Sequence, residues 1–169
     1  TMPKLQINGT NDPYWTLDSM NVFWDDLPGP KYVVYLPNAG HGLDQHRDYA
    51  LKGVAALFRH TISGRPLPRL AWKHSDTADG RLKLELTKAD PMPKDGQVWV
   101  ARSESKDFRH AHWQPAPEDA ISGLTFTTDR PASGSIAYFA DLAYEIDGLD
   151  FHLPPQRRAQ LRARLRPSQ

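Results

Sequence analysis

The sequence predicts an α/β fold, in which two parallel strands of a larger sheet are followed by a small β-sandwich of immunoglobulin-like type. Apolar runs at residues 5–7 and 32–36 are separated by a helical pattern of apolar residues. From residue 70 onward the apolar residues instead follow the pattern of short strands. A Gly- and Pro-rich stretch at residues 64–68 lies at the change. A strand, helix, strand unit is the repeat of a parallel sheet, whereas many short strands are typical of a sandwich.

Each of the two predicted strands leads into a loop that carries one ionisable residue. The first is followed by Gly-Thr-Asn-Asp-Pro, which contains Asp12, and the second by Pro-Asn-Ala-Gly-His, which ends at His41. This is the order in which an α/β-hydrolase sheet presents the last two members of a Ser-Asp-His triad. Asp12 would hold the imidazole of His41 in one tautomer, and His41 would act as the general base. We expect neither a metal ion nor a cofactor at this site.

Two further carboxylates compete with Asp12 for the imidazole. Asp18 and Asp44 are both close in sequence, but each is better placed to cap a helix. Tyr14 and Trp15 directly follow the acid. They would either line a substrate cleft or cover the end of the sheet.

The helical pattern on either side of the second strand predicts two helices. Between the strands, the apolar residues at helical spacing are Met20, Phe23, Trp24 and Leu27. After His41, a helix would present one apolar face made of Leu51, Val54, Ala55, Phe58 and Ile62. We expect that face to pack against the strands.

The predicted sandwich strands are residues 70–73, 81–87, 97–103, 109–113, 124–127 and 135–144. We therefore divide the chain into residues 1–64, the end of a hydrolase domain, 65–153, the sandwich, and a basic tail at 154–169. His110 and His112 would share one face of a strand. A zinc site is one interpretation of the pair, and an exposed strand face without a third ligand is the other.

Composition narrows the possible functions. The basic tail has five arginines, no acid and no aromatic residue, which predicts a solvated segment and argues against nucleic-acid binding. No apolar run approaches the roughly 20 residues that a membrane-spanning helix needs. The chain has no cysteine, so it has no disulfide.

The chain lacks a recognisable nucleophile. The pentapeptide G-x-S-x-G, which carries the serine of an α/β-hydrolase, does not occur, and Ser133 and Ser135 are typical of a turn. We therefore expect the chain to be the C-terminal part of a longer enzyme. The remainder, in the same gene or in a companion chain, would supply the serine and the oxyanion hole.

The run PKLQINGTNDPYWTLDS…LPGPKYVVYLPNAGHGL resembles the end of the hydrolase domain in the PhoPQ-activated pathogenicity-related protein family. The segments AWKHSD, VWVARSESKDFRHAHW and SGLTFTTD resemble the C-terminal extension of that family. This resemblance implies an α/β-hydrolase fold with a serine hydrolase triad, in bacterial proteins that are usually exported to the periplasm or secreted. In the matching motifs, Asp12 takes the position of the acid and His41 that of the base.

Two classes of function follow. In the first, the chain is part of a serine hydrolase that cleaves esters or amides in a small-molecule, peptide or polysaccharide substrate. In the second, the protein is a non-catalytic binding or secreted signalling protein on a hydrolase scaffold, and the sandwich carries recognition.

Overall fold

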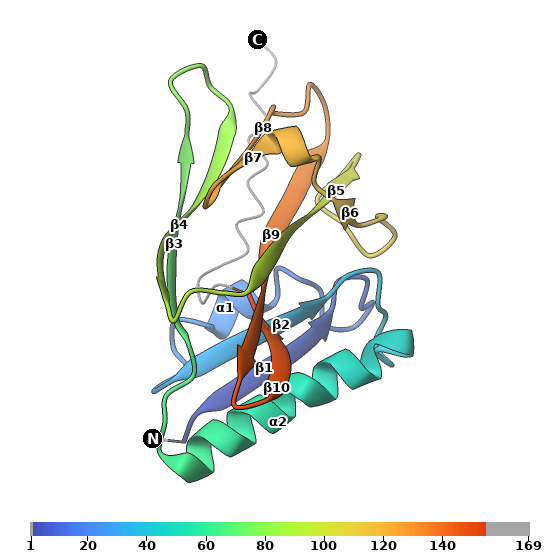
Figure 1. The fold of residues 1–169 in the computed structure, drawn as a ribbon. Helices are drawn as coiled ribbons and strands as arrows, with labels where there is room; N and C mark the ends of the chain where they lie inside the picture. Colours follow the sequence, from blue (N-terminus) through green and yellow to red (C-terminus); the bar gives the residue numbers. More distant parts are fainter. Residues whose placement is uncertain (1, 155–169) are drawn as a thin grey trace.

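The structure, a computed structural model, describes residues 2–154, which form one parallel strand pair with its helices and two four-stranded antiparallel sheets (Figure 1). More residues lie in strands than in helices. The α/β class and the parallel hydrolase sheet predicted from the sequence are therefore wrong. Within residues 2–154 a single pair of strands is parallel, and every other pairing is antiparallel.

The parallel pair consists of β1 (Lys4–Gly9) and β2 (Lys31–Leu36), which are in register over their full lengths. The connection between them contains the short helix α1 (Met20–Phe23). Parallel strands need such a crossover, because the chain must return to the starting edge before the second strand begins. β2 is buried from Tyr32 to Leu36, as its continuous apolar run predicts.

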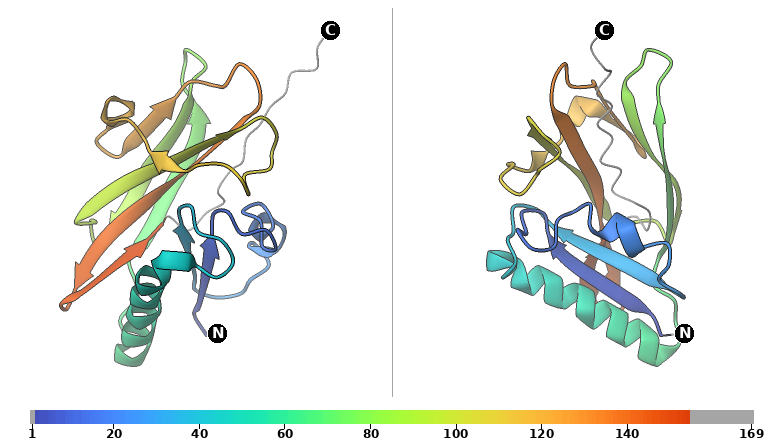
Figure 2. Two further views of the ribbon diagram at one scale, coloured as in Figure 1. Left: turned by 90° about the vertical axis from the view of Figure 1, so that its right-hand side faces the viewer. Right: turned by 180° about the vertical axis from the view of Figure 1, so that it is seen from behind.

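A 3-10 turn, η1 (Asp44–His46), leads into the helix α2 (Arg47–Ser63), which lies along the parallel pair (Figures 1 and 2). The helix faces the strands through small residues: a Cβ at Gly53 would already lie 3.4 Å from Cγ2 of Val34. The packed face predicted from the sequence is therefore wrong, because at Gly53 the helix lies too close to the strands for a large side chain. The buried positions are Ala50, Gly53, Ala56 and His60.

Four large apolar residues of α2 are exposed instead. We call them the outer face of α2, and they are Leu51, Val54, Phe58 and Ile62.

The two antiparallel sheets make up the rest of the chain. One sheet has the order β3 (Arg69–Asp76), β4 (Leu82–Asp90), β8 (Thr125–Thr128) and β7 (Ile121–Ser122). The other has the order β10 (Leu149–Leu153), β9 (Ser135–Ile146), β5 (Asp95–Ser103) and β6 (Gln114–Pro115), and the turn η2 (Glu118–Ala120) precedes β7. These are the strand orders A-B-E-D and G-F-C-C′ of immunoglobulin-type sandwiches.

Residues 109–113 are not the strand that the sequence predicts. They form a turn and an extended segment at the end of the β5–β6 loop (residues 104–113), and pairing with β5 begins only at Gln114. Conversely, β10 was not predicted. It pairs with β9 through a tight turn at Asp147 and Gly148, both of which have positive φ.

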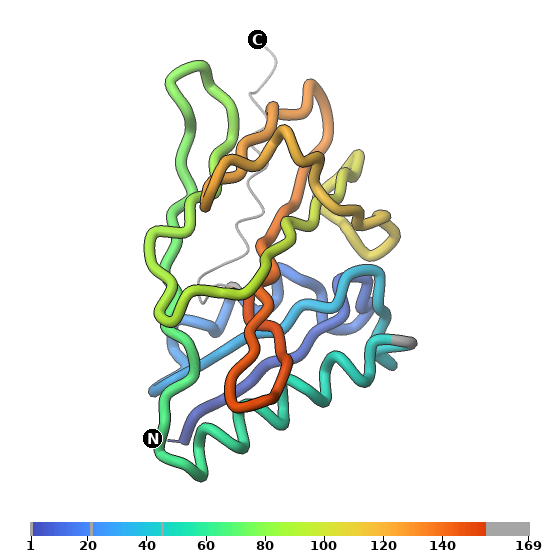
Figure 3. Tube along the Cα trace, viewed as in Figure 1, coloured from blue at the N-terminus to red at the C-terminus, as the bar shows by residue number. Residues whose placement is uncertain are grey.

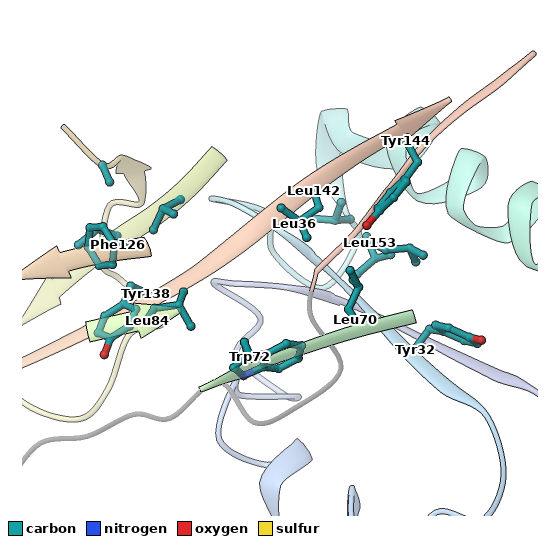
Figure 4. Packing of buried hydrophobic residues seen from close by; sticks show 14 of the residues in the cluster. Tyr32, Leu36, Leu70, Trp72, Leu84, Phe126, Tyr138, Leu142, Tyr144 and Leu153 are labelled. Atoms are coloured by element: carbon teal, nitrogen blue, oxygen red, sulfur yellow. The ribbon is translucent and has the colours of Figure 1, made fainter. Parts of the chain in front are cut away.

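The sandwich and the two helices together cover both faces of β2. Tyr32 and Leu36 belong to a core cluster that continues through α2 into both antiparallel sheets, where it includes Leu70 and Leu153 (Figure 4). On the opposite face, Tyr35 packs in a second cluster with residues from α1, β5 and β9. The β9–β10 hairpin crosses α2, as the tube trace shows (Figure 3). The core is thus continuous across residue 64, and the division of the chain at that residue stays a prediction.

The predicted basic tail at 154–169 lies, apart from Pro154, outside the described residues. Among the helices of the described part, none is both long and apolar enough to cross a bilayer.

Candidate active site

The acid loop after β1 buries the carboxylate of Asp12 and surrounds it with donors. Its Oδ1 accepts hydrogen bonds from the backbone N–H groups of Tyr14 at 2.8 Å and Trp15 at 3.0 Å. An aspartate that accepts from the residues directly after it forms a turn typical of Asp, and Pro13 helps to fix that turn. Because both backbone bonds go to Oδ1, Oδ2 stays available for a second partner.

That partner is His41, at the end of the histidine loop after β2. Its Nδ1 lies 2.9 Å from Oδ2 of Asp12. A carboxylate only accepts hydrogen bonds, so Nδ1 carries the proton and Nε2 has the free lone pair. Asp12 is 4% exposed and the His41 side chain is 55% exposed. Among the side chains that the structure describes, none forms a hydrogen bond with Nε2. The arrangement is that of an oriented general base, and its catalytic role stays a prediction.

The pairing depends on a close approach of the two loops. Thr10 N–H donates to the Leu36 carbonyl at 3.0 Å and Asn11 N–H to the Ala39 carbonyl at 2.9 Å. A Cβ on Gly9 would collide with the carbonyl oxygens of Ala39 and Gly40. Gly9 is therefore required by the distance between the backbones.

Burial and hydrogen bonding act in opposite directions on the Asp12 carboxylate. Burial is the largest single influence on the pKa of Asp12, and by itself it raises that pKa. The hydrogen bonds from Trp15, His41 and Tyr14, together with the charge of a protonated His41, outweigh it, so that the net pKa lies below its usual value. Asp12 is thus held ionised, which stabilises positive charge on the imidazole.

The two competing acids engage other groups. Asp18 accepts a hydrogen bond from the Thr16 hydroxyl at 2.6 Å, and Asp44 accepts one from the Gly40 N–H at 2.7 Å. Asp44 therefore closes the histidine loop from the far side, while the imidazole itself is held by Asp12.

The β5–β6 loop of the sandwich contacts both loops of the site. Asn11 Nδ2 donates to the carbonyls of Arg109 at 3.0 Å and Ala111 at 2.7 Å. Asn38 binds the backbone of Trp113 through both atoms of its amide. Sequence reasoning missed Asn11 and Asn38. The available signal was an Asn in each motif, directly before Asp12 and three residues before His41.

With this geometry established, the comparisons with known proteins decide the family. The sequence profile of the PhoPQ-activated pathogenicity-related protein family matches residues 1–109, which contain both loops and the first three strands of the sandwich. The chain belongs to this family. The family predicted from the sequence is thereby confirmed.

A curated relative of this PhoPQ-related chain is Autocrine proliferation repressor protein A of Dictyostelium discoideum. The two sequences are 26% identical over an alignment of 166 positions, which covers 85% of the chain and 34% of that protein. The chain therefore spans about a third of the length of this relative. No solved structure matches the chain.

Two exposed aromatic residues follow the acid in this PhoPQ-related chain, and one of them contacts the base. Tyr14 is 76% exposed and Trp15 58% exposed. The Tyr14 ring stands edge-on to the His41 ring, with 5.1 Å between centroids. Their backbones are held by Asp12, so their position relative to the imidazole is fixed. Both interpretations of these side chains, substrate wall and cover for the strand ends, stay open.

The remaining candidates from the sequence lie apart from the pair. His110 and His112 are both exposed and lie outside any strand, so the argument that they share a strand face does not apply. In the part of the chain that the structure describes, no three His, Cys, Asp or Glu side chains converge as a metal site. Ser133 lies in a turn, and Ser135 begins β9.

Proposed function

We propose that this chain is the C-terminal part of a serine hydrolase, in which Asp12 and His41 are the acid and the base of a Ser-Asp-His triad. The observation that supports this most directly is the 2.9 Å contact between His41 Nδ1 and a buried carboxylate, on a ring that is otherwise exposed. The proposal includes a relationship to the α/β-hydrolase superfamily. Support for that relationship comes from the order of acid and histidine along the chain.

The geometry suits general base catalysis. Nε2 of His41 would take the proton from the serine hydroxyl as its oxygen attacks the carbonyl carbon of the ester or amide. Asp12 stabilises the imidazolium that forms. The imidazolium then gives its proton to the leaving group as the acyl bond breaks, and a water molecule repeats both steps to release the acid.

The serine and the oxyanion hole would come from an N-terminal remainder of the same hydrolase, in the same gene or in a companion chain. Two observations support such a partner. The chain spans about a third of its curated relative. In addition, the outer face of α2 exposes four large apolar side chains, which are 45 to 69% accessible. A continuous apolar stripe of this kind marks a surface that another segment covers.

The substrate would be an ester or amide of a small molecule, peptide or polysaccharide, with Tyr14 and Trp15 along the cleft. A periplasmic or secreted location belongs to the same proposal and rests on the family alone.

The test is activity of the full-length protein that contains this chain. His41→Ala and Asp12→Asn should each lower kcat toward p-nitrophenyl acetate by about 10⁴-fold, the size of effect known for a triad acid. His110→Ala and Asp18→Asn are the matched controls, because they remove a histidine and an acid that do not join the pair. Full activity in His41→Ala would contradict the proposal.

The isolated chain provides a complementary test. We expect no turnover of p-nitrophenyl acetate above background, because an acid and a base without a nucleophile lack the covalent step. Turnover that His41→Ala abolishes would reveal a nucleophile inside the chain.

A second candidate function is a non-catalytic, secreted signalling protein in which the sandwich carries recognition. The observation that favours it is the printed name of the relative, which describes an autocrine repressor of proliferation. A full-length His41→Ala variant distinguishes the two functions. It should lose the biological effect of the protein if hydrolysis is required and retain it if the pair is vestigial.

A further inference from the structure

The sandwich contains an apolar cavity of about 320 Å³ between its two sheets. Trp72, Leu84 and Phe126 line it from one sheet, and Val98 and Leu142 line it from the other; four of these side chains are labelled in Figure 4. The inner faces of a sandwich normally interdigitate, and internal voids larger than a water molecule are few. The volume reaches the lower end of the range typical of small-molecule pockets.

The mouth of the cavity combines exposed apolar side chains with one carboxylate. Met92 and Leu124 are 61% and 47% exposed at the rim. Asp95 also lines the rim, and its Oδ1 accepts a hydrogen bond from the Gly96 N–H at 2.7 Å. Among the described residues, no cationic side chain pairs with Asp95. A ligand would therefore meet an apolar interior and a negative charge at the entrance.

We propose that the sandwich binds an amphiphilic amine, whose alkyl chain enters between the sheets and whose ammonium group lies beside Asp95. An unbranched chain suits walls that are apolar on both sides, and a cation complements the carboxylate at the rim. This site is separate from Asp12 and His41. It lies at the start of β5, whereas the loop that contacts Asn11 and Asn38 follows the end of that nine-residue strand, roughly 30 Å away.

Isothermal titration of the 169-residue chain with n-alkylamines from hexylamine to dodecylamine, below their micelle concentrations, tests the proposal. The dissociation constant should fall by about fourfold for each added methylene, the value expected for burial of one CH₂, until the cavity is full. It should then stop falling, with one ligand bound per chain. Affinity that keeps rising with chain length at variable stoichiometry indicates adsorption to the surface and overturns the proposal.

Head-group specificity gives an independent readout. Decylamine should bind more tightly than decanol, and decanol more tightly than decanoate. Asp95→Asn should weaken decylamine binding by up to about fivefold, the limit for an exposed ion pair, and leave decanol unchanged. Equal affinities for the amine and the carboxylate would overturn the assignment of Asp95.

Variants at the rim separate the cavity from other apolar surface. Met92→Ser and Leu124→Ser should weaken decylamine binding, and because both side chains are exposed, neither should impair folding. Leu51→Ser and Phe58→Ser, on the outer face of α2, are the matched controls and should have no effect. An equal loss of decylamine affinity in the two control variants would contradict the proposal. Sedimentation that shows a dimer dissociated by decylamine would assign the cavity to a second copy of the chain instead.

Discussion

Asn38 and Trp113, 75 residues apart, exchange two hydrogen bonds: Asn38 Nδ2 donates to the Trp113 carbonyl at 2.8 Å, and the Trp113 N–H donates to Asn38 Oδ1 at 2.8 Å. The amide thus pairs with a peptide group as a neighbouring strand would. Through this contact the sandwich fixes the loop that carries His41.

Asn38→Ala should lower the free energy of unfolding by about 2 to 3 kcal/mol, because it leaves two backbone groups unpaired. Asn38 also has a φ of 59°, a conformation that asparagine tolerates better than alanine. Asn38→Gly is the control, since glycine accepts this φ but lacks the amide. Urea unfolding should show a large decrease in the free energy of unfolding in both variants, and the decrease should be somewhat smaller in Asn38→Gly. If Asn38→Ala lost stability and Asn38→Gly did not, the cause would be the positive φ at this position and not the lost hydrogen bonds.

Gly9→Ala should destabilise the chain by about 1 to 3 kcal/mol, because a Cβ there forces the acid and histidine loops apart. Gly40→Ala is a matched control in the same site, since its Cβ would meet only Asp44 Oδ2 at an ordinary 3.5 Å. Thermal unfolding compares the two. Similar melting temperatures in both variants would show that the loops can separate at little cost.

The depressed pKa of Asp12 predicts a dependence of stability on acid. A group whose pKa is lower in the folded state stabilises it above the unfolded pKa, about 3.9 for Asp, and loses that effect as pH falls through the folded pKa. The free energy of unfolding should therefore fall less steeply between about pH 5 and pH 2 in Asp12→Asn than in the wild type. Parallel curves from urea titrations at each pH would contradict this prediction.

A second buried acid, Asp141 on β9, is contacted by residues that are distant from it in the sequence. The Tyr49 hydroxyl of α2 donates to its Oδ2 at 2.5 Å, and His152 Nδ1 lies 3.2 Å from the same oxygen. Burial, followed by the nearby carboxylate, raises the pKa of Tyr49, so the hydroxyl stays protonated as a donor.

Tyr49→Phe should cost about 1 to 3 kcal/mol of stability, because Asp141 loses its shortest hydrogen bond while it remains buried. Tyr14→Phe, an exposed tyrosine, should be neutral. The double variant Tyr49→Phe/Asp141→Asn should recover part of the loss in urea unfolding. Recovery would be absent if Tyr49 contributed by packing alone.

The sequence predicted well what depends on neighbours along the chain. The strand predicted over residues 81–87 corresponds to the first part of β4, and the two motifs located the loops of Asp12 and His41. It did not predict contacts made at long range. The packed face of α2 is predicted wrongly because periodicity identifies an apolar stripe but not the distance to the sheet, and at Gly53 that distance leaves no room for a large side chain.

The same limit explains the missed asparagines and the fold class. Asn11 and Asn38 gain their roles from a loop more than 70 residues away, to which no local pattern points. The sequence predicts a larger parallel sheet around the parallel pair, because a continuous apolar strand does not reveal what covers it. In this chain the sandwich and the helices cover the two faces of β2, the strand that contains Tyr35.

The continuous core has a consequence for protein engineering. A chimaera that joins residues 1–64 to a foreign sandwich would place unfamiliar side chains against Tyr32 and Leu36, where Leu70 and Leu153 now lie. Such a graft must therefore carry the native residues of β10 and the start of β3 with it. Two crossover points are then needed, one in the Asp79-Gly80 turn after β3 and one in the Asp147-Gly148 turn before β10, so that Leu70 and Leu153 both stay native.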